Sequence, residues 1–534
     1  MAGDSNYMSW TKNGLIQRVK ELEAELKSRP APPAPEPTPK PKGKRKVDPS
    51  KYSTRYVALK LAYLGKNYGG FEFQAMATQP SIEEELWNAL TKACLIFPKD
   101  DRVVDFECCE YSKCGRTDKG VSAFGQVIGL RVRSNRPLPK KRSQPSQGVE
   151  GGDAMVVDEQ LGEKAEAVEE EEGEEDSSFD PIKDELQYPR VLNRILPPDI
   201  RILAWCPAPP PDFSARFSCR ERQYRYFFTQ PAFSPDPKSG GKTGWLDIEA
   251  MRDAAKRYEG EHDFRNLCKI DPGKQITNFS RVIYEADIEE VKDVSSALPY
   301  LAKQEFAPAE GLDGSAIHPK VYSFNVRGSA FLWHQIRHMV AVLFLVGQRL
   351  EKPEIITQLL DTATNPCKPN YVMADEVPLV LWDCIFPGDD AAPTTTDKKD
   401  ALSWIYLADD PALGQFGQFG VIDGLWAHWR ERKLDELLSN QLLQLVSRQG
   451  GSDPARRIER PETAKQANSV IVYEGGNCGR MGGRYIPLMQ KDRLQAPEVQ
   501  NERYAKRKGF AGSEDMRQQR GFGRRKVDAS TADE

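Results

Sequence analysis

The chain has 534 residues, more than a single ordinary core holds, so two or more lobes with appendages are expected. No run of about 18 apolar residues occurs, and the amino terminus has no basic segment followed by an apolar one, so neither a membrane span nor a secretory signal is indicated. The net charge of −4 conceals a division, because residues 150–180 hold 14 acidic residues against Lys164 and contribute −13, which leaves +9 for the rest. A basic folded part favours a polyanionic partner, although a solubilising surface has the same composition.

The cysteines indicate the compartment. All ten are scattered along the chain, with Cys108 next to Cys109 and no CxxC pair anywhere. This distribution suits reduced thiols and argues against a zinc ribbon or a disulfide framework. We therefore expect a soluble, intracellular protein.

Residues 1–50 read as an appendage. Apolar residues recur at helical spacing between Leu15 and Leu26, which predicts a short amphipathic helix and leaves a coiled-coil arm open. Residues 29–50 form a Pro-rich linker that ends in the basic cluster Pro41–Val47. The cluster is interpreted as a nuclear import signal, a loose RNA contact or a solvated linker.

The first folded segment begins near Tyr56. Apolar residues alternate from Val57 to Tyr63 and predict a strand, which a glycine-rich turn follows. Ser81 and Glu84 form a capping box, so a helix begins there and its apolar face continues to a stop at Pro98.

The stretch from Cys114 to Ala123 organises this part of the chain. Asp118-Lys119-Gly120 is turn chemistry that leads into a strand through Ile128–Val132, so Asp118 lies on a tight loop at a sheet end. Arg116 stands two residues earlier, and the neighbouring glycines let a ligand approach closely. Such a carboxylate is suited to meeting a sugar or a phosphate, while a plain hairpin corner explains the same residues.

A long polar segment then interrupts the lobe. Residues 134–185 are polar, then strongly acidic and poor in apolar side chains, so they cannot build a core. We expect a disordered insertion rather than a domain. Folded sequence resumes at Tyr188 and includes a strand from Ile200 to Trp205.

Basic and aromatic residues intermingle in the next segment. Three arginines lie among three aromatic residues that share one face of a predicted strand: Arg216, Arg222, Arg225, Tyr224, Tyr226 and Phe228. Stacking surfaces combined with positive charge can hold extruded RNA bases. A strand that packs its aromatic residues into a core is the equal alternative.

A second cycle of helices and strands follows. A helix capped by Asp247 ends before Gly260, and strands are predicted at 282–288 and 322–326. A very apolar helix then runs from Phe331 to Val346.

The apolar helix carries two histidines and an arginine. His334 and His338 resemble the zinc-binding HExxH pattern, but Gln335 replaces the glutamate and no third ligand is evident, so we predict no metal site. Arg337 is followed at helical spacing by apolar residues, and a buried guanidinium needs an anionic partner such as a catalytic carboxylate. Snorkelling of Arg337 to solvent is the alternative.

The carboxyl-terminal part follows a strand predicted at Val377–Phe386. Residues 387–400 are interpreted as a linker and Trp426–Val446 as a helix with an apolar face. From residue 480 to residue 526, 13 basic residues stand against 5 acidic ones, which suggests a flexible arm that touches RNA.

In this order, the motifs resemble those of the TruA-type tRNA pseudouridine synthases. The matching stretches cover roughly residues 52–133 and 186–390, and they contain Gly115-Arg116-Thr117-Asp118-Lys119-Gly120-Val121-Ser122-Ala123, Ala215-Arg216-Phe217-Ser218, Tyr224-Arg225-Tyr226 and the Arg337 helix. Cys114 before the first motif, Ser122 where many relatives carry His, and the stretch Met373–Leu379 resemble the eukaryotic tRNA pseudouridine(38/39) synthase branch. The acidic insertion and the carboxyl-terminal extension depart from the bacterial pattern.

The resemblance implies an α+β fold, the pseudouridine synthase fold. Two lobes with antiparallel sheets merge around a central RNA-binding cleft in that fold. The implied lobes are residues 51–206, which include the disordered acidic insertion, and residues 207–390. They are flanked by the appendage at 1–50 and by an extension at 391–534 with a helix and a basic tail.

The resemblance also assigns roles to single residues. Asp118 matches the catalytic aspartate, Tyr224 the tyrosine that stacks on the target base, Arg337 the arginine paired with the catalytic carboxylate, and Arg116 the arginine that helps displace the target nucleotide. Arg216, in the second motif, is expected to bind the substrate.

The implied activity is isomerisation of uridine to pseudouridine at positions 38/39 in the anticodon stem-loop of tRNA, without a cofactor. The expected partner is the anticodon arm of tRNA, not a membrane; a homodimer stays open, and the expected location is nucleus, cytoplasm or both. Two other classes are considered: a non-catalytic tRNA-binding or folding protein of the same fold, and a metal hydrolase that uses the paired histidines.

Overall fold

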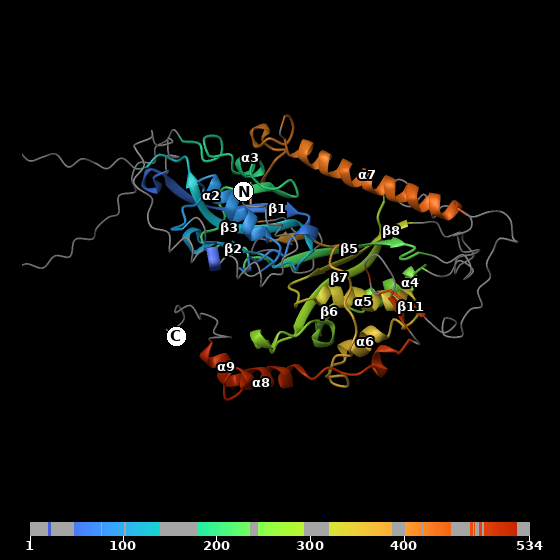
Figure 1. The fold of residues 1–534 in the computed structure, drawn as a ribbon. Helices are drawn as coiled ribbons and strands as arrows, with labels where there is room; N and C mark the ends of the chain where they lie inside the picture. Colours follow the sequence, from blue (N-terminus) through green and yellow to red (C-terminus); the bar gives the residue numbers. More distant parts are fainter. Residues whose placement is uncertain are drawn as a thin grey trace, which may run out of the picture. The chain divides into compact units, whose positions relative to one another are not determined.

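Ten strands form one mixed sheet in this computed structural model (Figure 1). The sheet order is β10-β4-β1-β3-β9-β5-β8-β7-β6, with β2 beside β3. The strands are β1 (Ser53–Tyr63), β2 (Ser112–Lys113), β3 (Ser122–Ser134), β4 (Ile200–Cys206), β5 (Glu221–Gln230), β6 (Gly260–Asp263), β7 (Ser280–Glu290), β8 (Lys320–Gly328), β9 (Leu379–Ile385) and β10 (Ile405–Tyr406). A separate small sheet pairs β11 (Val470–Val472) with β12 (Arg480–Gly482).

The structure describes most of the chain, in segments. They are residues 20–22, 47–75, 77–100, 103–138, 179–234, 244–292, 320–386, 401–418, 420–449, 470–473, 475, 480–482 and 485–520. Residues Pro49–Glu534 form one compact unit and Met1–Asp48 another. The predicted amino-terminal helix and linker lie outside the described residues, apart from the helical residues 20–22 and residues 47–50, and so does the linker predicted at 387–400.

Strand β9 joins the two halves of the sheet. It runs parallel to β3, with Ser122 opposite Val380, and antiparallel to β5, with Tyr224 opposite Leu381. The other pairings in the large sheet are antiparallel. Because β9 lies between β3 and β5, the start of β3, which follows the Asp118 loop, is two strands away from Tyr224 on β5.

Two hydrophobic cores lie on the two halves of this sheet. The first contains side chains of β1, β3, β4, α2 (Ile82–Lys92) and α3 (Tyr188–Asn193). The second contains side chains of β5, β7, β8, α4 (Ile248–Lys256), α5 (Gln335–Gly347) and α6 (Ile355–Leu360). Figure 1 shows α2 beside β1 and β3, and α4 and α5 beside β7. A mixed α and β fold with a large, mostly antiparallel sheet is thus confirmed, and the lobe boundary at 206 stays a prediction.

The predicted elements are largely confirmed, with shifts at their ends. The strands predicted at 56–63, 200–205, 282–288, 322–326 and 377–386 are β1, β4, β7, β8 and β9. Ser81 caps α2 with both hydrogen bonds of the capping box, and Asp247 caps α4. The predicted stop of α2 at Pro98 is wrong, because the helix ends at Lys92 and Cys94 has a left-handed φ of 53°.

The described residues of the carboxyl-terminal extension form three further α-helices: α7 (Val421–Arg448), α8 (Pro497–Arg507) and α9 (Ser513–Gln519). Helix α7 confirms the helix predicted at Trp426–Val446 and extends it. Helix α8 is anchored, because the Asn501 side-chain amide donates to the Ile276 carbonyl at 3.1 Å. The expectation of a flexible arm is therefore wrong for residues 485–520, whereas contact with RNA stays a prediction. None of the described helices combines the length and hydrophobicity needed to cross a membrane.

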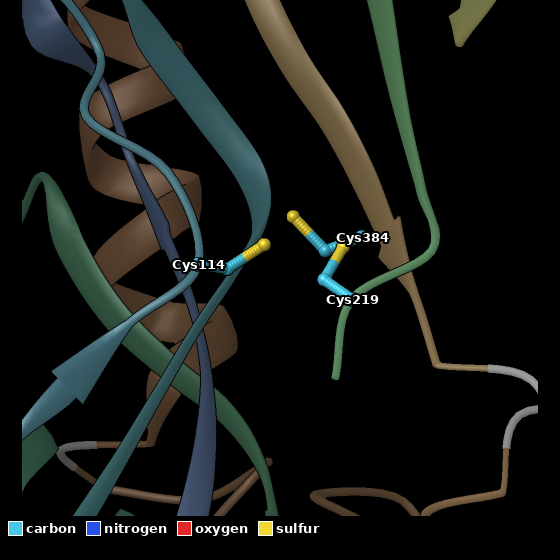
Figure 2. A group of neighbouring side chains, drawn as sticks. All are labelled: Cys114, Cys219 and Cys384. Carbon is cyan, nitrogen blue, oxygen red and sulfur yellow. The ribbon is translucent and has the colours of Figure 1, made fainter. Parts of the chain in front are cut away.

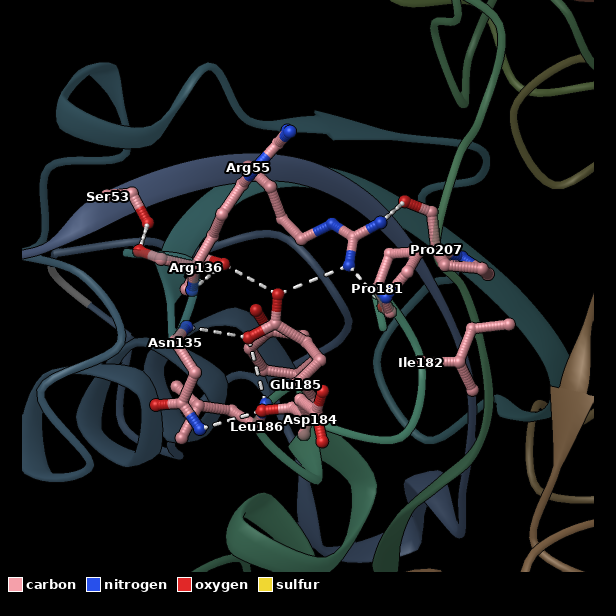
Figure 3. Close-up of polar contacts among 12 residues, drawn as sticks. Ser53, Arg55, Asn135, Arg136, Pro181, Ile182, Asp184, Glu185, Leu186 and Pro207 are labelled. Atoms are coloured by element: carbon pink, nitrogen blue, oxygen red, sulfur yellow. Dashed lines mark hydrogen bonds and ion pairs between the residues drawn. The ribbon is translucent and has the colours of Figure 1, made fainter. Parts of the chain in front are cut away.

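The disorder predicted for residues 134–185 is wrong at both ends of this segment, which are folded (Figure 3). Residues 139–178 lie outside the described part of the chain. Glu185 is buried, and its carboxylate accepts hydrogen bonds from the Ser134 hydroxyl at 2.6 Å and the Asn135 amide at 2.8 Å. Arg55 of β1 adds an ion pair at 3.2 Å. One buried carboxylate thus joins the two ends of the insertion, which composition alone could not indicate.

Replacing Glu185 tests this closure. Burial alone would raise the pKa of Glu185, but hydrogen bonds from Ser134, Asn135, Leu186 and Arg55 outweigh it and lower the pKa. A lowered pKa contributes stability that is present above the unfolded value of about 4.3 and is lost as the pH falls through the folded value. We expect Glu185→Gln to lower the free energy of unfolding by about 3 kcal/mol at neutral pH, because Arg55 loses a buried partner.

The measurement is urea unfolding of both proteins between neutral and acid pH. The difference between wild type and Glu185→Gln should shrink as the pH falls below about 4. The exposed neighbour Asp184 provides the control variant, Asp184→Asn, which should cost less than Glu185→Gln. Equal losses in both variants would contradict a closing role for Glu185.

Candidate functional site

A pocket of about 710 Å³ opens beside the junction that β9 makes. Its wall combines five segments of the chain: residues 111–118, residues 214–217, Tyr224 with Arg222, residues 268–276 and residues 330–337. Both halves of the sheet therefore contribute to one concave surface, which is the usual place for a ligand.

The 114–121 loop is tied to the sheet on both sides. The side-chain amide of Gln126 accepts from the Gly115 N–H at 3.0 Å and donates to the Gly115 carbonyl at 2.9 Å. The hydroxyls of Tyr63 and Thr117 lie 2.7 Å apart. These bonds satisfy the backbone of a tight turn, so the loop holds its shape without a ligand.

Asp118 projects from this loop into the pocket and is partly buried. The Trp333 indole N–H donates to Oδ1 at 3.2 Å, and Nε2 of His334 lies 3.4 Å from Oδ2. Burial raises the pKa of Asp118 above its ordinary value, while the charges of Arg337 and Lys274 and the indole hydrogen bond oppose the rise. A carboxylate in this setting is less solvated, and so more reactive, than one at the surface.

His334 ends a loop that the sequence had assigned to a helix. The helix predicted at Phe331–Val346 begins only at Gln335, because His334 has a left-handed φ of 58°. Burial lowers the pKa of His334 to about 4, so its ring is neutral at neutral pH. His338, one turn on, contacts Nζ of Lys368 at 2.9 Å instead of the pocket. The two histidines therefore have different partners.

Arg337 is buried, as expected, but its partner differs from the predicted one. Its guanidinium donates to Oε2 of Glu376 at 2.6 Å and to the Ala374 carbonyl at 2.7 Å. The expected direct pair with Asp118 does not occur among the described contacts, in which the carboxylate that pairs with the guanidinium is that of Glu376. Arg337 acts on Asp118 through its charge, not through a hydrogen bond.

Tyr224 lines the pocket, unlike its two aromatic neighbours on β5. Its ring meets Phe331 edge to face, with 5.2 Å between centroids. Tyr226 and Phe228 are buried in the second core and contact Phe344. The strand therefore runs from the pocket wall into the core: the core reading is confirmed for Tyr226 and Phe228, and a role of Tyr224 in holding a base stays a prediction.

Arg116 and Arg216 also line the pocket, and both are exposed. Nε of Arg116 pairs with Glu72 at 3.3 Å. The Arg216 guanidinium lies over the ring of Phe217, 5.3 Å from its centroid, and that ring is 75% exposed. These groups offer charge and stacking surface to a polyanionic ligand.

The sequence reasoning missed Trp333, His334, Glu376 and Gln126. The signal for Trp333 and His334 was their position just before Arg337. The predicted helix included both residues, and so the turn that they form was missed. Glu376 stood inside the stretch noted for its resemblance, without a role. Gln126 lay in an apolar strand, where only its burial marks it as unusual.

Known proteins are similar to this chain over most of its length. A sequence profile described as tRNA pseudouridine synthase matches residues 254–387. The human tRNA pseudouridine(38/39) synthase is 42% identical over 92% of this chain and 87% of its own length, and the bovine protein of that name is 35% identical over the same shares. The yeast protein of that name is 33% identical over 95% of this chain and 93% of its own length.

The chain belongs to the tRNA pseudouridine(38/39) synthase family. Proteins named tRNA pseudouridine synthase A are more distant, such as that of Moorella thermoacetica, which is 26% identical over 57% of this chain. The family resemblance read from the motifs is therefore confirmed. In this synthase, the pocket that holds Asp118 is built from residues inside the profile match and from the half of the sheet before it.

A double-mutant cycle tests the partner of Arg337. We expect Arg337→Met and Glu376→Gln to show a coupling of about 1 kcal/mol in the free energy of unfolding, discounted because Glu376 is about a third exposed. Arg337→Met with Asp118→Asn is the matched cycle for the pairing that sequence predicted. It should give a smaller coupling, and a larger one would restore the direct pair.

Proposed function

We propose that this synthase isomerises uridine to pseudouridine at positions 38/39 of tRNA, in the anticodon stem-loop. One observation carries the proposal: a partly buried aspartate and an aromatic wall share a cationic pocket, in a chain 42% identical over most of its length to a synthase named for that reaction. The names of the human, bovine and yeast relatives state the substrate, tRNA, and the positions 38/39.

Asp118 is the residue proposed to act on the nucleoside. Isomerisation breaks the bond from C1′ to N1, turns the uracil and rejoins it through C5, with no redox step. A carboxylate can attack C1′, stabilise a cationic sugar or remove a sugar proton. The hydrogen bond from Trp333 and the contact with His334 orient the carboxylate without neutralising it, because His334 carries no charge at neutral pH.

The remaining pocket residues are proposed to hold the tRNA. A nucleotide in a stem must leave its stack before a carboxylate can reach C1′. Tyr224 and Phe331 offer an edge-to-face pair against which a freed uracil stays bound. Arg116 and Arg216 supply positive charge beside the pocket, where they favour phosphates and fill the space a flipped nucleotide leaves.

Substitution of the aspartate tests the catalytic role. We expect Asp118→Asn to abolish pseudouridine formation and to leave tRNA affinity within a few-fold, because binding rests on many phosphate contacts. Purified protein, a tRNA transcript and pseudouridine mapping are sufficient. Asp271→Asn is the matched control, since the Asp271 carboxylate faces the same pocket but caps the Gly273 amide, and it should keep most of the activity.

An unchanged rate in Asp118→Asn would remove the catalytic assignment. Loss of tRNA binding in that variant would instead show that Asp118 maintains the fold. The alternative of a non-catalytic binding protein predicts equal tRNA affinity with and without Asp118 and no pseudouridine from either protein. The two results are separated by measuring affinity and single-turnover rate on the same preparation.

The pH dependence of the rate offers a second test. Asp118 must be ionised, and its pKa is raised, so activity is lost on acidification at a higher pH than an ordinary aspartate would give. The charge of Lys274 lowers the pKa of Asp118 and that of Glu376 raises it. We therefore expect Lys274→Met to move the acid limb of kcat/KM to higher pH and Glu376→Gln to move it to lower pH. Shifts in the same direction would show that the limb reports another group.

A further inference from the structure

Three cysteines from distant parts of the chain meet below the pocket (Figure 2). Cys114 begins the loop that carries Asp118, Cys219 precedes β5, and Cys384 lies in β9. Their sulfur atoms all lie within 4.8 Å of one another. Figure 2 shows the Cys114 side chain directed toward the other two. The exposed fractions are 5%, 6% and 0%, so the group is closed to bulk water.

We propose that Cys114, Cys219 and Cys384 bind a thiophilic divalent cation, Zn²⁺. Zinc–thiolate bonds of about 2.3 Å in a tetrahedral arrangement place sulfur atoms about 3.8 Å apart. The sulfur atoms here lie within 4.8 Å of one another, so side-chain rotations that bring them about 1 Å closer would close the site. Thiolates are ligands that Zn²⁺ prefers, and with three of them a water molecule would complete the tetrahedral arrangement.

The charge around the cysteines suits a divalent ion. The guanidinium of Arg222 is nearby and donates to the Cys114 carbonyl at 3.4 Å. Three thiolates with Zn²⁺ carry a net charge of −1, which the charge of Arg222 balances in a buried place.

The pocket provides a path to the cysteines. Cys114 and Arg222 line its wall and the other two cysteines do not, so an ion with one coordinating water would enter from the Cys114 side when the side chains there move. The bound ion would join the first residue of the Asp118 loop to β9 and to the start of β5. These are the elements that hold the two halves of the sheet together, so the site would stabilise the junction rather than take part in the isomerisation.

Cobalt titration of the full-length protein tests the site. The protein is stripped of metal under reducing conditions and titrated with Co²⁺, whose thiolate complexes absorb in the near ultraviolet. We expect one equivalent to bind with a thiolate-to-cobalt charge-transfer band, and Zn²⁺ to displace it. Wild-type Tm should rise on addition of Zn²⁺. Absence of the band at stoichiometric Co²⁺ would overturn the proposal and leave the thiols as core side chains.

Single substitutions then locate the ion. Cys114→Ser, Cys219→Ser and Cys384→Ser should each weaken Co²⁺ affinity by at least the roughly 10- to 100-fold that even the loss of an outer-shell partner costs. Cys109→Ser is the control, because Cys109 is 1% exposed and outside the group. It should bind as wild type does.

Folding is checked separately by near-ultraviolet circular dichroism. If a serine variant fails to fold, the corresponding alanine variant is titrated, and the wild-type titration still decides whether an ion binds. Unchanged affinity in all three folded variants would overturn the assignment to these cysteines.

Discussion

The pairing of β9 with both β3 and β5 is the constraint on which the rest of the structure depends. Its two registers, Ser122 with Val380 and Tyr224 with Leu381, place the end of the Asp118 loop and the aromatic wall on the two strands that flank β9. Each half of the sheet has its own core, so neither half alone builds the pocket. A strand that arrives late in the chain therefore completes a site whose other parts lie in both halves.

The pKa of Asp118 depends on a balance between burial and the charges around it. Burial raises the pKa of the carboxyl group, and the fixed charges of Arg337 and Lys274 limit the rise. Arg337 can keep its charge in the protein interior because Glu376 and the Ala374 carbonyl satisfy the guanidinium. The arginine thus shapes the field at Asp118 while leaving both carboxylate oxygens accessible to the indole, the imidazole and a ligand.

Two groups of polar side chains, one around Glu185 and one formed by three cysteines, connect distant segments of the framework. Glu185 closes the ends of the acidic insertion onto β1 and β3, so a long solvated segment can be inserted without opening the first core. The three cysteines lie elsewhere, where the Asp118 loop meets β9. Both groups connect segments that are far apart in the sequence.

Local patterns in the sequence were sufficient for strands β1, β3, β4, β5, β7, β8 and β9, the capping box at Ser81, the N-cap at Asp247, the burial of Arg337 and the family itself. These features depend on side chains within a few residues of each other, and on motifs whose spacing is preserved along the chain. The sequence did not predict that the helix starts at Gln335 instead of Phe331, because tertiary contacts decide the left-handed turn at His334.

Only the tertiary structure decided which groups meet across distance. It paired Arg337 with Glu376, brought Trp333 and His334 to Asp118, and gathered cysteines that the sequence had presented as scattered. Such partners are set by strand order and loop closure, which a one-dimensional pattern does not contain, since residues 114, 219 and 384 become neighbours only when β9 inserts between β3 and β5.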